Sequence, residues 1–426
     1  KSLYKLDLSG NKLVALPEDA FLPTPNLVSF NAGNNSLSVL ASGLFGGLQH
    51  LVELDLSHNE LHAEWLTESS FRGLIRLIVL NLSHNKINKL NVQVLRDMYN
   101  VQVLYISNNR LSQIPLNAFS SCVNLSKLDL SYNKLSLIGE KAFQGVNVLS
   151  YLALGNNEIT SIHPGAFTNL TVLHDLNING NKLTSIPKAV GSLRNLHTLD
   201  LGDNLINNLV NMPVQKLQHL YGLRLVNNRI TGNISKETFL DLPSLKVLNL
   251  AKNGINYIEE GAFDTNLKLQ AVRLDGNFLN SVKGLFENLP NLDWLNVSAN
   301  NIDMFDYHFI PPSLLWLGLH NNRITELGNS FGRHDLKLEI LDVSFNNLKH
   351  VSSVNIPDSV QMVFMNDNKI STVEPFTFLK KLNLTRVDLF ANELSSLDMT
   401  ALRLTRVPDE KALPQFYLGE NSFVCD

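Results

Sequence analysis

Cysteine is nearly absent from this sequence, with two residues in 426, Cys122 and Cys425. Cys122 falls in a predicted loop, and we expect a buried, unpaired thiol there. No run of about 20 apolar residues occurs, so nothing predicts a transmembrane helix. Neither sign of charge dominates, because 35 Lys and Arg residues stand against 39 Asp and Glu residues. This balance argues against a nucleic-acid-binding protein or a polybasic membrane surface.

The signatures of enzymes and cofactor sites are also missing. There is no Gly-x-Gly-x-x-Gly, no phosphate-binding loop, no His-Glu-x-x-His, no Cys-x-x-Cys and no Gly-x-Ser-x-Gly. Aspartates recur at one position of a repeat, where solvated surface explains them better than paired catalytic carboxylates. They are Asp7, Asp55, Asp129, Asp200, Asp342 and Asp388. We therefore predict a non-enzymatic protein with no catalytic residue, no metal site and no cofactor.

What the sequence has in abundance is one repeated pattern, Leu3-x-x-Leu6-x-Leu8-x-x-Asn11. It occurs eighteen times, in steps that are mostly 24 residues and range from 22 to 29. This spacing is that of the leucine-rich repeat. The asparagines are Asn11, Asn35, Asn59, Asn85, Asn109, Asn133, Asn157, Asn181, Asn204, Asn228, Asn253, Asn277, Asn300, Asn322, Asn346, Asn368, Asn392 and Asn421.

The spacing within a repeat predicts the fold. Two leucines two residues apart share one face of a short strand, and the residue between them points to the opposite face. The asparagine amide is expected to bond the backbone of its own repeat and of the next one. A phenylalanine about ten residues later should fill the convex side, as at Phe21, Phe45, Phe119, Phe143, Phe167 and Phe263. The fold class is a leucine-rich-repeat solenoid (horseshoe), with a parallel inner β-sheet and with loops and short helical turns on the convex side.

Two further features of the repeats call for an interpretation. Trp65 lies in a repeat lengthened by two residues, where we favour a convex core plug over a binding role. The histidines His308, His320, His334 and His350 crowd a short stretch. They can form a pH-sensing cluster, but solvated loop histidines are the interpretation we favour.

Seven Asn-x-Ser/Thr sequons occur, and none falls on a core leucine or a ladder asparagine. All seven are therefore expected to face solvent, and together they favour an extracellular, glycosylated chain. The predicted glycosylation sites are Asn34, Asn81, Asn124, Asn169, Asn233, Asn296 and Asn383.

Large apolar residues gather in one column of the predicted inner sheet. The residue two positions after the first leucine of each repeat is Trp294, Trp316, Ile340 or Met362 in four consecutive repeats. Phe364 lies in the adjacent column and Arg386 continues the first one. These six residues are the candidate ligand-binding site, because an apolar stripe with a polar rim marks a protein interface. Alternatively, they pack on one another and bind nothing.

The C-terminal stretches carry a resemblance to known families. Asn421-Ser-Phe-Val-Cys425-Asp resembles the opening of the cysteine-rich cap of extracellular leucine-rich-repeat proteins, with Ser422 in place of the usual proline. Residues 383–392, 401–404, 407–408 and 413–419 resemble the end of the first repeat block of insect Toll receptors, especially the long-ectodomain subclass. Residues 59–65 and 71–74 are also similar to that subclass.

These resemblances imply a domain division. Residues 1–412 hold leucine-rich repeats 1–17, and residues 413–426 hold the last repeat strand and the start of a truncated cap. Cys425 would form a disulfide with a partner outside the chain. Because an uncapped solenoid exposes its core, we expect a piece of a longer ectodomain.

The Toll resemblance implies a type I membrane receptor at the plasma membrane, with a TIR domain and signalling by dimerisation in innate immunity or development. Its partner would be a protein ligand, either a Spätzle-like cystine-knot cytokine or a cell-surface protein. The alternative is a leucine-rich-repeat adhesion or guidance protein without a TIR domain.

Overall fold

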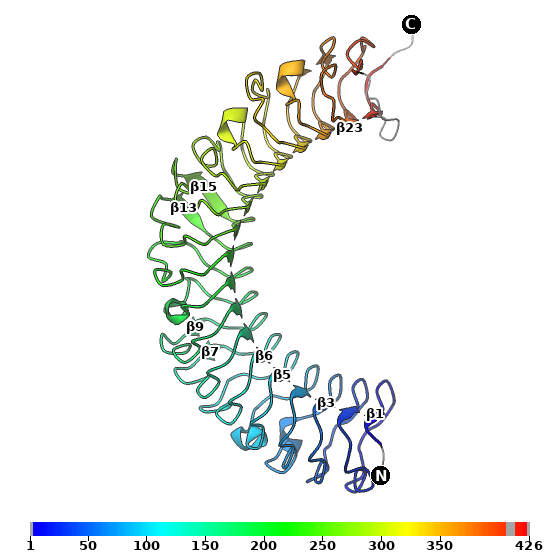
Figure 1. The fold of residues 1–426 in the computed structure, drawn as a ribbon, viewed down its shortest axis with the longest axis vertical. Coiled ribbons are helices and arrows are strands. Elements are labelled where there is room, and N and C mark those ends of the chain that lie inside the picture. Colours follow the sequence, from blue (N-terminus) through cyan, green and yellow to red (C-terminus); the bar gives the residue numbers. More distant parts are fainter. Residues whose placement is uncertain (1–2, 406–413, 424–426) are drawn as a thin grey trace. The chain divides into compact units, whose positions relative to one another are not determined.

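The computed structural model describes residues 3–405 and 414–423, and it divides the chain into two compact units. The first consists of Lys1–Ile206 and Asn211–Leu220, and the second of Asn207–Val210 and Tyr221–Asp426. In each unit the strands of a parallel sheet line one side, and loops and turns line the other (Figure 1). We call these sides the sheet face and the loop side. The described residues include no helix long and apolar enough to cross a membrane.

Each repeat of the first unit contributes one three-residue strand to a parallel sheet. Short elements follow on the loop side: a two-stranded sheet of β7 (Leu137–Ile138) and β9 (Ser161–Ile162), and the 3₁₀ helices η1 (Ala63–Trp65), η2 (Val92–Leu95) and η3 (Lys188–Ser192). The sheet strands are β1 (Lys5–Asp7), β2 (Ser29–Asn31), β3 (Glu53–Asp55), β4 (Val79–Asn81), β5 (Val103–Tyr105), β6 (Lys127–Asp129), β8 (Tyr151–Ala153), β10 (Asp175–Asn177) and β11 (Thr198–Asp200).

The second unit repeats this plan. Its loop side holds the pairs β13 (Thr231–Ile234) with β15 (Gly254–Ile258) and β20 (His350–Val351) with β22 (Thr372–Val373), and the 3₁₀ helices η4 (Tyr307–Phe309) and η5 (Ser353–Asn355). The sheet strands are β12 (Gly222–Arg224), β14 (Val247–Asn249), β16 (Ala271–Arg273), β17 (Trp294–Asn296), β18 (Trp316–Gly318), β19 (Ile340–Asp342), β21 (Met362–Phe364), β23 (Arg386–Asp388) and β24 (Gln415–Tyr417). The predicted leucine-rich-repeat solenoid is confirmed in both units.

Stacked aromatic rings fill the core beneath the loop side. All six predicted phenylalanines are buried, with at most 4% of each side chain exposed. Their rings stack from repeat to repeat, as between Phe119 and Phe143, whose centroids lie 6.4 Å apart at an interplanar angle of 7°. A single repeat has no second ring to cover this apolar surface, so each repeat depends on its neighbours for stability.

The ladder asparagines bond neighbouring repeats, but in the direction opposite to the prediction. The amide of Asn59 donates to the carbonyls of Leu56 (3.2 Å) and Ser57 (3.1 Å) in its own repeat, and to Ala32 (2.9 Å) in the preceding one. Its Oδ1 accepts from the N–H of Leu37 at 2.8 Å. The Ala32 N–H donates to the Asp55 carbonyl of the next repeat at 2.8 Å, and the Ala32 carbonyl accepts from the Asn59 amide instead of a backbone donor.

The residue before each ladder asparagine has a positive φ in all eighteen repeats. Three of these residues are glycines, whereas others carry bulky side chains, such as Tyr132 (φ 54°) and Phe345 (φ 53°). This left-handed conformation is unfavourable for non-glycine residues. The asparagine that follows, fixed by its hydrogen bonds, holds the turn. Sequence analysis missed this position because its residue type varies.

Candidate ligand-binding face

The structure brings the predicted column of apolar residues together on adjacent strands. Trp294 of β17 pairs in register with Trp316 of β18, which pairs with Ile340 of β19. Ile340 pairs with Met362 of β21, and Met362 with Arg386 of β23. Each side chain is half-buried. The predicted adjacency is therefore confirmed, and ligand binding by this column stays a prediction.

The two tryptophans form a flat aromatic surface. Their ring centroids lie 4.6 Å apart and their planes differ by 7°. Gly318, two residues beyond Trp316 on the same strand, makes this possible. A Cβ atom at Gly318 would lie 2.5 Å from Cη2 and 2.8 Å from Cζ3 of the Trp316 ring. The ring therefore packs directly on the glycine, a contact that the repeat register could have indicated but that sequence analysis did not identify.

Arg386 is the centre of a second cluster rather than a simple rim charge. Its guanidinium lies between the rings of Phe364 (5.0 Å to the centroid) and Tyr417 (4.5 Å). It also donates to Asp388 Oδ2 at 2.9 Å. Cation–π contacts and an ion pair fix a side chain that otherwise has many rotamers. Sequence analysis missed Tyr417 and interpreted Asp388 as solvated surface, although both share the column of Phe364 and Asp388 is only 9% exposed.

Polar groups border the tryptophan pair. Arg273 donates two hydrogen bonds to Asp275, at 2.9 and 2.8 Å. His320 Nδ1 lies 2.8 Å from Ser298 Oγ and 3.3 Å from Asp342 Oδ2. The Asp342 interaction raises the pKa of His320, against a smaller lowering by burial. Burial alone would raise the pKa of Asp342, but hydrogen bonds from His320 and Ser344 outweigh it and lower that pKa.

The sequons differ in accessibility. Asn34, Asn124, Asn169, Asn233 and Asn383 are exposed, and Asn81 is half-buried. Asn296 is only 9% exposed, and its Oδ1 accepts from the Ser298 N–H at 3.1 Å. The expectation that every sequon faces solvent is therefore wrong at Asn296, because its side chain bonds the turn that follows its strand. Glycosylation of the seven sites stays a prediction.

Trp65 and Cys122, which the sequence singled out, are not part of the sheet strands. Trp65 is 43% exposed in η1, so the predicted core plug is wrong: the inserted residues carry the ring outside the packed repeats. Cys122 is fully buried and unpaired, as predicted, and burial raises the pKa of its thiol to about 12. Cys425 lies outside the described residues.

The titratable groups singled out in the sequence have local roles. His308 pairs with Asp306 at 2.7 Å and His350 with Glu374 at 3.5 Å, so these histidines have separate partners. The recurrent aspartates accept a hydrogen bond from the N–H two residues later, as Asp129 does from Ser131 at 2.9 Å. They stabilise turns, and all but the buried Asp388 also meet solvent. Among the described residues, no cluster of His, Cys, Asp and Glu could hold a metal ion.

Comparison with known proteins agrees with this architecture. Toll-like receptor 7 of Drosophila melanogaster is 43% identical over 242 residues, which cover 57% of this chain and 17% of the receptor. A leucine-rich-repeat protein of Leptospira interrogans superposes with a TM-score of 0.74 at 26% identity, covering 92% of this chain and 91% of that one. A glycosylated Drosophila Toll–Spätzle complex gives a TM-score of 0.71 at 24% identity, covering 92% and 50%, which shows the shared fold.

The resemblance to insect Toll receptors is thus confirmed over part of the chain, and the chain spans less than a fifth of that receptor's length. The family model described as leucine rich repeat matches residues 1–61, 64–111, 99–159, 147–206 and 218–279, more than half of the sequence. The chain belongs to the leucine-rich-repeat family.

Proposed function

We propose that this chain is an extracellular ligand-recognition region of a Toll-type transmembrane receptor. The similarity to a Drosophila Toll-like receptor supports the receptor class. The ligand is a protein, of the cystine-knot cytokine type or a cell-surface partner, and signalling follows dimerisation. The Toll structure with a similar fold was solved as a complex with Spätzle, which supports a protein ligand.

One observation carries the assignment of the binding face, namely the rigid aromatic surface between Trp294 and Tyr417. Stacked tryptophans and an arginine held between two rings lose little conformational entropy when a partner covers them. Trp, Tyr and Arg are also the residues enriched at binding hot spots. The proposed contact residues are Trp294, Trp316, Ile340, Met362, Phe364 and Arg386.

Truncation of Trp316 to alanine tests this face. We expect Trp316→Ala to weaken binding of a Spätzle-type cytokine to the whole ectodomain by about 2 kcal/mol or more, as for interface tryptophans. The measurement is surface plasmon resonance across a panel of cystine-knot cytokines. Trp65→Ala is the matched control, since Trp65 is exposed on the loop side of the other unit. Unchanged affinity of Trp316→Ala for a cytokine that binds the parent would exclude the face.

The receptor class has a separate test. Reading the coding sequence past Asp426 should reveal a further repeat block, one apolar stretch of about 20 residues and a TIR domain. A lipid-anchor signal or an unrelated cytoplasmic segment would contradict the receptor proposal and favour the adhesion or guidance alternative.

A further inference from the structure

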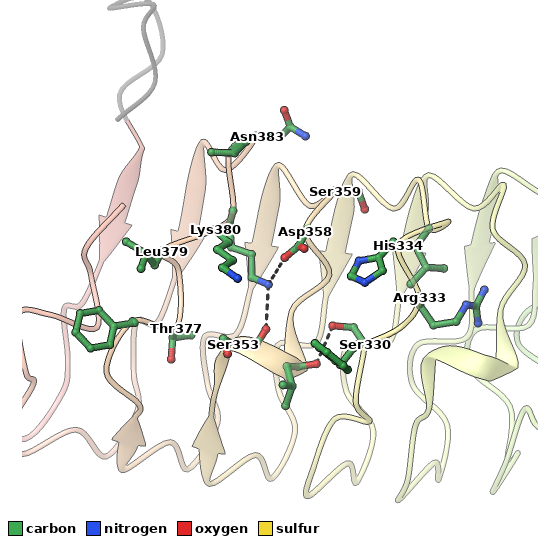
Figure 2. A pocket seen from close by; sticks show the side chains of 16 residues that line it. Ser330, Arg333, His334, Ser353, Asp358, Ser359, Thr377, Leu379, Lys380 and Asn383 are labelled. Atoms are coloured by element: carbon green, nitrogen blue, oxygen red, sulfur yellow. Dashed lines mark hydrogen bonds and ion pairs between the residues drawn. The ribbon is translucent and has the colours of Figure 1, made fainter. Parts of the chain in front are cut away.

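A groove of about 730 Å³ lies on the loop side of the second unit. Turns from three consecutive repeats line it: residues 330–336, 353–359 and 376–383 (Figure 2). Its volume is within the range of sites that bind small molecules or peptide side chains. None of the sheet-face residues described above contributes to it.

The rim of this groove is apolar and unusually exposed. Phe331 is 77% exposed, Leu382 57% and Phe376 45%. Phe376 also has a φ of 64°, which a non-glycine residue adopts only when its surroundings hold it there. Its N–H donates to the Thr400 carbonyl at 3.1 Å, which fixes the turn. Three large apolar side chains displayed around one cavity indicate a surface that another molecule covers.

A buried ammonium group lies inside this apolar rim. The Lys381 side chain is 5% exposed, and its Nζ donates to the Ser353 carbonyl at 2.9 Å and to Asp358 Oδ1 at 2.6 Å (Figure 2). An ammonium has three N–H donors, so these two bonds leave one for a ligand. Asp358 is half-exposed, so solvent screens its attraction for the ammonium.

The remaining charges make the groove cationic. Lys380 also lines it, and its side chain forms no hydrogen bond or ion pair within the described part of the chain. Arg333 is a third cation in the lining, but it is ion-paired with Asp335 at 3.0 Å, so Lys380 supplies the unmatched charge. Asp358 is the single carboxylate among the described lining residues. An acidic group entering between the apolar side chains would therefore meet an excess of positive charge.

We propose that this groove binds an acidic, apolar peptide segment of a second protein partner. A Glu or Asp carboxylate of that segment accepts from the third N–H of Lys381 and pairs with Lys380. Aromatic or aliphatic side chains on either side of the carboxylate pack on Phe331, Phe376 and Leu382. A purely acidic ligand would leave the apolar rim side chains exposed to water. A purely apolar ligand would leave the third N–H of Lys381 without an acceptor. The proposal is independent of the sheet-face function.

A glycan is the competing occupant, because the sequon residue Asn383 lies at the rim. In Figure 2 the Asn383 amide points away from Lys380 and Asp358. A sugar linked there would start outside the cavity, which leaves the cavity open to a peptide.

Fluorescence polarisation with matched probes tests the proposal. The probes are labelled Gly-Phe-Glu-Leu-Gly and its Gln counterpart, titrated with the whole chain. We expect the Glu probe to bind about tenfold more tightly, the effect of one hydrogen bond to a charged group. Lys380→Gln and Phe331→Ser should each weaken it about fivefold or more. No binding at about 1 mM, or equal binding of both probes, would overturn the proposal.

Two controls separate the groove from general surface effects. Lys337→Gln and Phe345→Ser change an exposed lysine and an exposed phenylalanine that do not line the groove. Both should leave binding of the Glu probe within about twofold of the parent. A loss as large as that of Phe331→Ser would contradict the assignment. If glycosylated protein fails to bind while Asn383→Gln binds, the glycan occupies the groove and the proposal is wrong.

Discussion

Replacing one ladder asparagine by alanine measures how strongly neighbouring repeats are coupled. Asn157 is 7% exposed, and its amide donates to Leu130 (3.0 Å) in the preceding repeat and to Leu154 (3.1 Å) and Gly155 (3.3 Å) in its own. Its Oδ1 accepts from the N–H of Leu135 at 3.0 Å. Asn157→Ala removes all of these bonds and leaves the backbone groups without the side-chain partner that serves them.

The free-energy cost of Asn157→Ala follows from the number of hydrogen bonds that the Asn157 side chain can make. The amide has two N–H donors for three carbonyls, so at most two full donated bonds and one accepted bond are lost. At about 1 kcal/mol each, this amounts to about 3 kcal/mol, and unsatisfied buried backbone groups raise it to about 5 kcal/mol. Asn11→Ala is the matched control, since exposed Asn11 donates only to Leu8 and Ser9 of its own repeat. We expect Asn11→Ala to lower the free energy of unfolding by about 1 kcal/mol or less.

Native-state hydrogen exchange is the appropriate assay, because unfolding of a repeat array need not be two-state. The Leu135 amide should lose protection by the full free energy of the Asn157→Ala change, and amides of the adjacent repeats should lose it too. Urea unfolding gives an independent value for the same change. A loss below about 1 kcal/mol, or one equal to that of Asn11→Ala, would refute the view that the asparagine ladder couples the repeats.

Three other measurements follow from the structure. Gly318→Ala should displace the Trp316 ring, destabilise by about 1 to 3 kcal/mol and reduce the near-ultraviolet circular dichroism of the tryptophan pair, and an unchanged spectrum would contradict the close contact. Cys122, with its pKa raised to about 12, should react with thiol reagents at pH 8 only after unfolding, so rapid labelling of folded protein would contradict its burial. His320→Gln should destabilise most where His320 is charged and Asp342 ionised. Because the pKa of His320 is raised above its ordinary 6.5, this contribution is full below about pH 6.5 and is lost as pH rises through the raised pKa. Because the pKa of Asp342 is lowered, it is lost again as pH falls through that value, and a pH-independent difference in urea midpoint would contradict the pair.

The periodicity of the sequence was enough to predict the fold and much of the geometry of the candidate face. A pattern repeated at nearly constant spacing places equivalent residues on adjacent strands, so the spacing alone puts Trp294, Trp316, Ile340 and Met362 in one column. The buried phenylalanines followed from the same register. These features recur at a constant spacing, and that spacing can be read directly from the linear sequence.

Side-chain direction, by contrast, depended on packing in three dimensions. Trp65 is exposed, Asn296 is buried on the sheet face and Arg386 lies between two rings, because each conformation is fixed by atoms from other parts of the fold. The direction of the asparagine bonds depended likewise on which carbonyls the sheet leaves unpaired. The loop-side groove arises from turns of three repeats whose sequences share no motif, since its shape depends on how neighbouring turns pack.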